Sequence, residues 1–247
     1  MSDILFSTIE QWQGEFPWGS MLDAGTGEQS LEWITSLENT SWTAVTGDQY
    51  RAEGLKHQFN SRIRTQDSII TANWLNHETL ANKSFDVVIA DYLLGAIEGF
   101  SPYFQDQLFS RLKPHVGQFL YIIGMEPLEK PSTEGEKLIK EIVDLRDACI
   151  LLAGHKPYRE YPRTWTERQM KRDGYTILKS CSFPILFGRR FINGQLDVCK
   201  RKLGFIKNTT LSRSLAAHIL ELRTASLRFV DRNGKIEFGS DYIIKAE

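Results

Sequence analysis

Hydrophobic and polar positions alternate in a regular order along the first two thirds of the chain. Short apolar runs are followed by segments in which apolar residues recur every three or four positions, which is the spacing of an amphipathic helix. We interpret the apolar runs as strands, at 20–24, 41–47, 67–74, 84–94 and 118–124. Helical spacing occupies segments between them, at 28–37, 50–59 and 103–114. This order predicts an α/β fold with a doubly wound, mostly parallel sheet and right-handed crossovers.

The last third of the chain has a different order. Helical spacing continues through a long segment, 138–152, and through 164–174, and a sixth strand is expected within 175–188. Two more helices, 191–203 and 211–230, precede an alternating segment, 239–247, that we interpret as the last strand. We see no repeat, low-complexity segment or linker. We therefore predict a single domain, 1–247, with an N-terminal segment, 1–19, and a helical insertion, 189–236, between strands six and seven.

Composition narrows the possible partners. The 247 residues include 30 basic and 31 acidic side chains, with no long block of one sign and no basic stripe with interleaved aromatics, so we expect no nucleic-acid partner. No apolar run approaches the roughly 18 residues of a membrane helix. The N-terminus lacks a cleavage pattern, so we expect a cytoplasmic protein. A homodimer is compatible with the sequence.

The cysteines and histidines indicate no metal site. The three cysteines, Cys149, Cys181 and Cys199, are too scattered for a disulfide framework or a zinc site, and we expect them to pack as small apolar residues. We expect the histidines other than His155 to lie on the surface: His57, His77, His115 and His218. We predict no bound metal.

The first strand leads into a glycine turn, "LDAGTGEQS". Glycines at this place let the backbone approach a ligand closely and expose the N–H groups of the following helix. A dinucleotide site prefers G-x-G-x-x-G/A, but here Ser30 stands at the last position. In addition, the Asp23 carboxylate would repel a pyrophosphate in the same turn and would attract a cationic amine. The turn therefore predicts an amino-acid-like ligand attached to an adenosine.

These residues resemble the first motif of the class I, seven-stranded S-adenosylmethionine-dependent methyltransferases. The resemblance extends from about Gly19 to Gly124. It implies helices on both faces of a seven-stranded sheet whose last strand is antiparallel, with S-adenosylmethionine as the methyl donor. It also implies transfer of a methyl group to an oxygen, nitrogen or sulfur atom. We expect the acceptor to be a small molecule.

The resemblance implies a role for each residue of its motifs. The first motif would bind the donor through Asp23, Ala24, Gly25, Thr26 and Gly27. Asp48, after the second strand, would hold the ribose hydroxyls. After the third strand, Asn73 would accept a hydrogen bond from adenine and Trp74 would stack on its ring. After the fourth strand, Asp91 and Tyr92 would face the donor and the acceptor, with Asp91 both binding the donor and contributing to catalysis.

An unusual loop, "LLAGHKPYREYPRTW", follows the long helix. We expect its histidine, His155, to act as a general base for acceptors that must lose a proton. Tyr158 and Arg159 of the same loop, and Arg190 after the sixth strand, are expected to contact the substrate, because an arginine can grip a carboxylate or phosphate. A solvated polar connector is the alternative interpretation of this loop.

Two other functions remain open at this point. A nicotinamide-dependent oxidoreductase shares the glycine turn and the acidic residue after strand two, although Asp23 and Ser30 disfavour it. A non-catalytic protein of the methyltransferase fold, which binds the donor as a regulator or binds nothing, is the second alternative.

Overall fold

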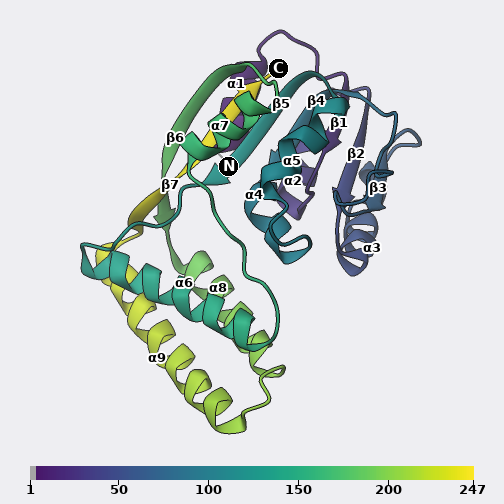
Figure 1. Ribbon diagram of the computed structural model, residues 1–247. Helices are drawn as coiled ribbons and strands as arrows, with labels where there is room; N and C mark the ends of the chain where they lie inside the picture. Colours follow the sequence, from purple (N-terminus) through teal and green to yellow (C-terminus); the bar gives the residue numbers. More distant parts are fainter. Residues whose placement is uncertain (1–3) are drawn as a thin grey trace. The chain divides into compact units, whose positions relative to one another are not determined.

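A seven-stranded sheet organises the chain in the computed structural model, which describes residues 4–247 (Figure 1). The strand order is β3-β2-β1-β4-β5-β7-β6. Strands β1 to β5 pair with one another in parallel, and β7 is antiparallel to β5. This confirms the predicted fold class. The strands are β1 (Ser20–Asp23), β2 (Ser41–Thr46), β3 (Ser68–Thr71), β4 (Phe85–Asp91), β5 (Val116–Met125), β6 (Ile177–Phe187) and β7 (Ile236–Ala246).

The helices agree with the predicted segments except for two. Neither α1, which precedes the glycine turn, nor the four-residue α4, which directly follows β4, was predicted. The α-helices are α1 (Ile4–Gln13), α2 (Glu28–Ile34), α3 (Gln49–Gln58), α4 (Leu93–Ala96), α5 (Gln105–Leu112), α6 (Glu134–Leu152), α7 (Arg163–Arg172), α8 (Arg189–Leu203) and α9 (Thr209–Asn233). The short 3₁₀ segments are η1 (Asn60–Arg62), η2 (Ile97–Gly99) and η3 (Lys113–His115).

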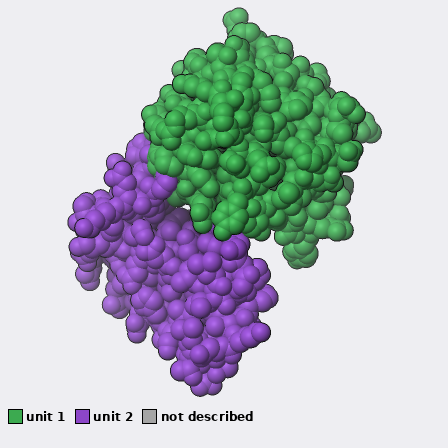
Figure 2. All heavy atoms as spheres, in the orientation of Figure 1, with its two compact units in different colours: residues 1–126, 159–182, 241–247 green, residues 127–158, 183–240 purple. Residues whose placement is uncertain are grey.

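The chain divides into two compact units (Figure 2). Unit 1 comprises residues 1–126, 159–182 and 241–247, and unit 2 comprises 127–158 and 183–240. Helices α8 and α9 lie between β6 and β7, where the helical insertion was expected, and they belong to unit 2 together with α6. A single functional domain stays a prediction.

The core of unit 1 is built on strands that are covered on both faces. Successive residues of β4, from Val87 to Ala90, are all at most 1% exposed. Such a continuous apolar run is typical of a parallel strand between two helical layers. The register pairs Asp23 at the end of β1 with Ala44 of β2 and Ile89 of β4. The carboxyl ends of these three strands therefore form one edge of the sheet.

Unit 2 contains helices α6, α8 and α9, which share an apolar core. Helix α6 begins with a capping box, in which Thr133 Oγ1 accepts a hydrogen bond from Glu136 N at 3.2 Å and Glu136 Oε2 accepts one from Thr133 N at 3.3 Å. Cys149 and Cys199 are fully buried in this core, as predicted, whereas Cys181 of β6 is half-buried.

His115 corrects one expectation, because it is only 2% exposed. Its Nδ1 lies 2.7 Å from the carbonyl of Lys83, and its ring tilts against Trp74 at 5.6 Å. Burial lowers the pKa of the imidazole, with a smaller lowering from the positive charge of Arg111. His115 follows Pro114 in a polar stretch, so the local sequence pattern did not indicate that its side chain is buried.

Candidate active site

The turn between β1 and α2 is held by one hydroxyl group. Gly27 is the N-cap of α2, in an extended conformation, and its N–H donates to Ser30 Oγ at 3.0 Å. Ser30 Oγ in turn donates to Asp23 Oδ2 at 2.7 Å. Ser30 thereby ties the end of the strand to the start of the helix. This is a physical reason for serine at the position where dinucleotide sites have glycine or alanine.

Asp23 is completely buried inside this turn. Besides Ser30, its carboxylate accepts from Gly25 N at 3.4 Å and from the Thr26 side chain. Burial raises the pKa of Asp23 to about 6, and these hydrogen bonds and the positive charge of Arg51 oppose the shift. The carboxyl group of Asp23 is therefore mostly ionised at pH 7, and its buried charge lowers the free energy of unfolding. Its hydrogen bonds shape the turn from inside.

Two glycines allow the segment after β4 to lie directly on the β1 and β2 ends. A Cβ on Gly25 would lie 2.8 Å from Leu93 Cδ1, and a Cβ on Gly47 would lie 2.7 Å from Phe100 Cδ1. Both distances are shorter than carbon–carbon contacts allow. Phe100 keeps 47% of its surface exposed. The space above both glycines is therefore bounded by apolar side chains of α4 and of the residue after η2.

Asp48 lies exposed at the carboxyl end of β2, where the resemblance requires an acidic residue. It is the N-cap of α3 and accepts a hydrogen bond from Arg51 N at 3.1 Å. The guanidinium of Arg51 approaches Gly27, since a Cβ there would lie 3.1 Å from its Nη2. Arg51 therefore connects the second strand end with the glycine turn.

Asn73 is already engaged on both sides of its amide. Its Nδ2 donates to the carbonyl of Phe100 at 3.3 Å, and its Oδ1 accepts from Ser101 Oγ at 2.7 Å and from Leu75 N at 2.9 Å. The oxygen that we expected to receive the adenine N–H thus has two donors within the chain. These bonds hold the Phe100–Ser101 backbone in place.

Trp74 is buried beneath the glycine turn, with 3% of its surface exposed. Its Nε1 donates to the carbonyl of Ala24 at 2.6 Å, and the guanidinium of Arg111 lies 5.7 Å from its ring centroid. An indole ring that is covered to this extent packs against the glycine turn and has no free face on which an adenine could stack. Phe100 is the partly exposed aromatic side chain that adjoins Gly47. Phe100 is far from the third strand in the sequence, so motif analysis did not single it out.

Asp91 is the last residue of the fourth strand, and Tyr92 follows it. Asp91 is half-buried and pairs with Ile123 of β5. Tyr92 has a left-handed backbone, with φ of 48°, and its amide donates to the carbonyl of Ile123 at 3.0 Å. A non-glycine residue in this conformation is strained by about 1–2 kcal/mol. Such strain, where it is held by the surrounding structure, is often found at functional sites.

The unusual loop reaches this strand end through two residues. Arg159 N donates to the carbonyl of Gly95 at 3.2 Å. The carboxylate of Glu160 lies against the same glycine, because a Cβ there would be 2.6 Å from Glu160 Oε2. Sequence analysis did not single out Glu160 as a site residue. Its approach to Gly95 depends on two segments that are 65 positions apart.

Three of the predicted acceptor residues belong to unit 2. His155 is exposed, and its ring meets Phe205 edge-on at 5.3 Å. Tyr158 is half exposed, and Arg190 lies in the first turn of α8. Unit 1 contains all the other predicted site residues: Asp23, Ala24, Gly25, Thr26, Gly27, Asp48, Asn73, Trp74, Asp91, Tyr92 and Arg159.

Within residues 4–247, no group of three or more His, Cys, Asp or Glu side chains is arranged to hold a metal ion. None of the helices described for this chain is long and apolar enough to cross a membrane.

Comparison with known proteins identifies the fold. No protein-family model matches the sequence, and no curated protein matches it. A candidate methyltransferase of Bacillus halodurans C-125 is similar in structure, with a TM-score of 0.60 and 12% identity over 98% of this chain and 97% of that chain. A mycolic acid cyclopropane synthase in complex with S-adenosylhomocysteine gives 0.58 and 12%, over 98% and 82%.

A third structure is an S-adenosylmethionine-dependent methyltransferase of Thiobacillus denitrificans, in complex with S-adenosylhomocysteine. Its TM-score is 0.52 and its identity 13%, over 98% of this chain and 90% of that chain. These likenesses show that the chain has the seven-stranded fold of the class I methyltransferases, as the glycine turn and the strand order predicted.

Proposed function

We propose that the protein is an S-adenosylmethionine-dependent methyltransferase that acts on an oxygen, nitrogen or sulfur atom of a small molecule. One observation carries this proposal. The Asp23–Gly27 turn, Asp48 and Asp91 lie at the carboxyl ends of β1, β2 and β4, which are neighbours in the sheet. Open α/β sheets bind ligands at this edge. The structural neighbours crystallised with S-adenosylhomocysteine support the choice of cofactor.

The residues at this edge fit the donor better than a dinucleotide. S-adenosylmethionine carries a positive ammonium and a positive sulfur, and the three aspartates provide negative charge at the β1, β2 and β4 ends. The Asp23 carboxylate lies buried inside this turn and would repel a pyrophosphate there, although the Arg51 guanidinium lies near Gly27. Gly25 and Gly47 let Leu93 and Phe100 pack directly on the backbone, and these two side chains provide apolar surface at this edge.

When bound, S-adenosylmethionine supplies a methyl group that its positive sulfur has already activated. The chain's own task is then proximity and orientation. We assign Asp23 to holding the turn in shape and contributing negative charge. Asp48 binds the ribose hydroxyls, and Phe100 takes the place beside adenosine that we expected for Trp74.

Acceptor contacts are assigned to the segments around the end of β4. Asp91 and Tyr92 orient the acceptor, and Arg159 binds a polar group on it. We keep His155 as the candidate base for acceptors that lose a proton, with Tyr158 and Arg190 as further acceptor contacts. A cytoplasmic location and a homodimer also stay predictions.

Calorimetry tests the cofactor assignment. S-adenosylhomocysteine should bind with a 1:1 stoichiometry, and NADH should give no saturable heat. Asp48→Ala should weaken S-adenosylhomocysteine binding at least tenfold, whereas Glu53→Ala, an exposed acidic residue one turn further along α3, should leave it unchanged. Binding of NADH alone would contradict the proposal.

A non-catalytic member of the fold is the second candidate. It is favoured by the contacts of Leu93 on Gly25 and Phe100 on Gly47, and by the two donors already on Asn73 Oδ1. Saturable binding of S-adenosylhomocysteine, together with no methyl transfer from labelled donor to a panel of alcohol, amine and thiol acceptors, would favour this candidate.

A further inference from the structure

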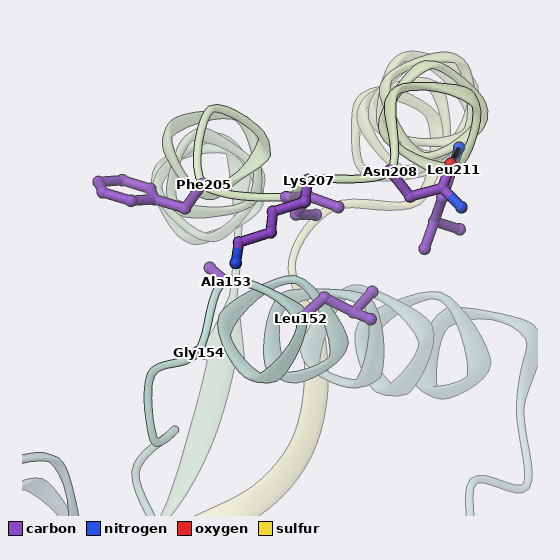
Figure 3. Close-up of a pocket in the computed structure, with 8 residues that line it drawn as sticks. Leu152, Ala153, Gly154, Phe205, Lys207, Asn208 and Leu211 are labelled. Atoms are coloured by element: carbon purple, nitrogen blue, oxygen red, sulfur yellow. Dashed lines mark hydrogen bonds between the residues drawn. The ribbon is translucent and has the colours of Figure 1, made fainter.

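A separate pocket lies wholly within unit 2 (Figure 3). It has a volume of about 340 Å³ and opens between the carboxyl end of α6 and the connection from α8 to α9. Figure 3 shows the end of α6 on one side and the 205–211 segment on the other. The lining residues are Leu152, Ala153, Gly154, Phe205, Ile206, Lys207, Asn208 and Leu211.

The walls of this pocket are mainly apolar and unusually exposed. Leu152 is 46% exposed, Phe205 60% and Leu211 37%. Single exposed apolar side chains are normal on protein surfaces, but several around one hollow indicate a binding site. The volume is within the range of about 300–1,000 Å³ that is typical of small-ligand sites. A concave site of this size fits a single small molecule better than a flat protein or membrane surface.

The charged side chains near the pocket are positive, whereas the carboxyl end of α6, which also borders it, carries a partial negative charge. Lys207 lines it, and Figure 3 shows its ammonium group directed toward Ala153 at the end of α6. No Asp or Glu occurs between Asp197 and Glu221. The first turn of α9 has no acidic residue, so the partial positive charge of this 25-residue helix is not offset there by the chain. The cations of the same stretch are Lys200, Arg201, Lys202, Lys207 and Arg213.

We propose that this pocket binds an amphiphile with one unbranched hydrocarbon chain and an anionic head group, such as a medium-chain carboxylate. The chain lies against Leu152 and Leu211, and the head group faces Lys207. The site is distinct from the β1–α2 turn of unit 1, and its occupation does not require S-adenosylmethionine.

Calorimetry with alkanoates below their micelle concentration tests the assignment. Hexanoate, octanoate and decanoate should bind with rising affinity, by about fourfold for each added CH₂ group, because each buried CH₂ contributes a constant increment. Decyltrimethylammonium, which has the same chain and the opposite charge, should bind at least tenfold more weakly than decanoate. The titrations are made on the full chain without donor.

Two variants locate the site. Leu211→Glu places a negative charge in the pocket and should weaken decanoate binding at least tenfold. Leu220→Glu is the matched control, because Leu220 lies on the same helix, is 66% exposed and does not line the pocket. Lys207→Gln should weaken decanoate binding but leave the binding of decanol unchanged, which separates the charge from the apolar contact.

Three kinds of outcome would overturn the proposal. The first is no saturable binding of decanoate up to its micelle concentration. The second is equal binding of decanoate and decyltrimethylammonium, or an equal loss in Leu211→Glu and Leu220→Glu. The third is sedimentation with anionic phospholipid vesicles in the absence of monomeric binding, which would assign the patch to a membrane surface. None of these results depends on whether S-adenosylhomocysteine binds in unit 1.

Discussion

Asp23 allows a direct test of what a buried negative charge does to the stability of this protein. The buried carboxylate can be replaced by the isosteric amide in Asp23→Asn. The amide oxygen can accept the hydrogen bond from Gly25 N, and the amide nitrogen can donate to Ser30 Oγ. The Ser30 hydroxyl can then donate to the Gly27 carbonyl, which already lies 3.3 Å away. Gly25 N and the Ser30 hydroxyl each keep a partner, so the main changes are the loss of one buried negative charge and the addition of a second amide N–H.

The magnitude can be worked out from the pKa. Burial raises the pKa of Asp23 from 3.8 to about 6, a difference of about 2 units, and each unit corresponds to about 1.4 kcal/mol. Between these two pH values the folded protein binds more protons than the unfolded chain. The free energy of unfolding therefore falls as the pH rises through this interval and stays lower above pH 6, by about 3 kcal/mol. In Asp23→Asn the side chain does not titrate, so the free energy of unfolding does not fall for this reason as the pH rises.

We expect Asp23→Asn to unfold at the same urea concentration as the wild type near pH 4, and to be more stable by about 1–3 kcal/mol at pH 8. Tryptophan fluorescence is a suitable signal, because all six tryptophans lie in unit 1: Trp12, Trp18, Trp33, Trp42, Trp74 and Trp165. Asp48→Asn, at an exposed position, serves as the control. A gain in Asp23→Asn that is absent at pH 8, or equal at pH 4 and pH 8, would refute the reasoning.

Three further predictions concern the same edge of the sheet. The dissociation constant of S-adenosylhomocysteine should rise about tenfold per pH unit below pH 6, as Asp23 is protonated; calorimetry that finds no change down to pH 5 would speak against a role for its charge. Gly47→Ala should destabilise the protein by about 1–3 kcal/mol through its clash with Phe100, and Phe100→Ala in the same chain should restore most of that loss in urea unfolding. Asn73→Ala should destabilise it by about 1–2 kcal/mol and speed amide exchange around Ser101; unchanged exchange would show that Asn73 does not hold this segment.

Periodicity predicted most of the fold because most of the strands and helices are longer than the error in their boundaries. The continuous apolar run of β4, for example, arises because this strand is buried on both faces. The spacing of three and four residues in α6 arises because this helix is buried on one face. The four-residue α4 is too short to show a period. Its position is fixed by tertiary contacts, because Leu93 packs on Gly25 and the strained Tyr92 turns the chain at the end of β4.

The candidate site was predictable where a role depends on local backbone chemistry. The turn from Asp23 to Gly27 could be found from local spacing, because glycines and a capping serine act within a few residues, whereas Asp48 was singled out through the family resemblance. The contacts of Asn73 and Trp74 could not be predicted from the sequence. Whether an indole faces a ligand or the core depends on which segments cover it, and those segments are far away in the sequence.

The sequence by itself determined the order of strands and helices and the glycine turn, since both arise from local periodicity and from backbone conformations that only certain residues accept. Only the tertiary structure decided that Trp74 and His115 are buried, that Phe100 lies over Gly47 and Glu160 against Gly95, and that His155 belongs to a different compact unit from Asp91. The reason is that burial and close approach depend on two segments together, and the sequence pattern of one segment does not indicate which other segment packs against it.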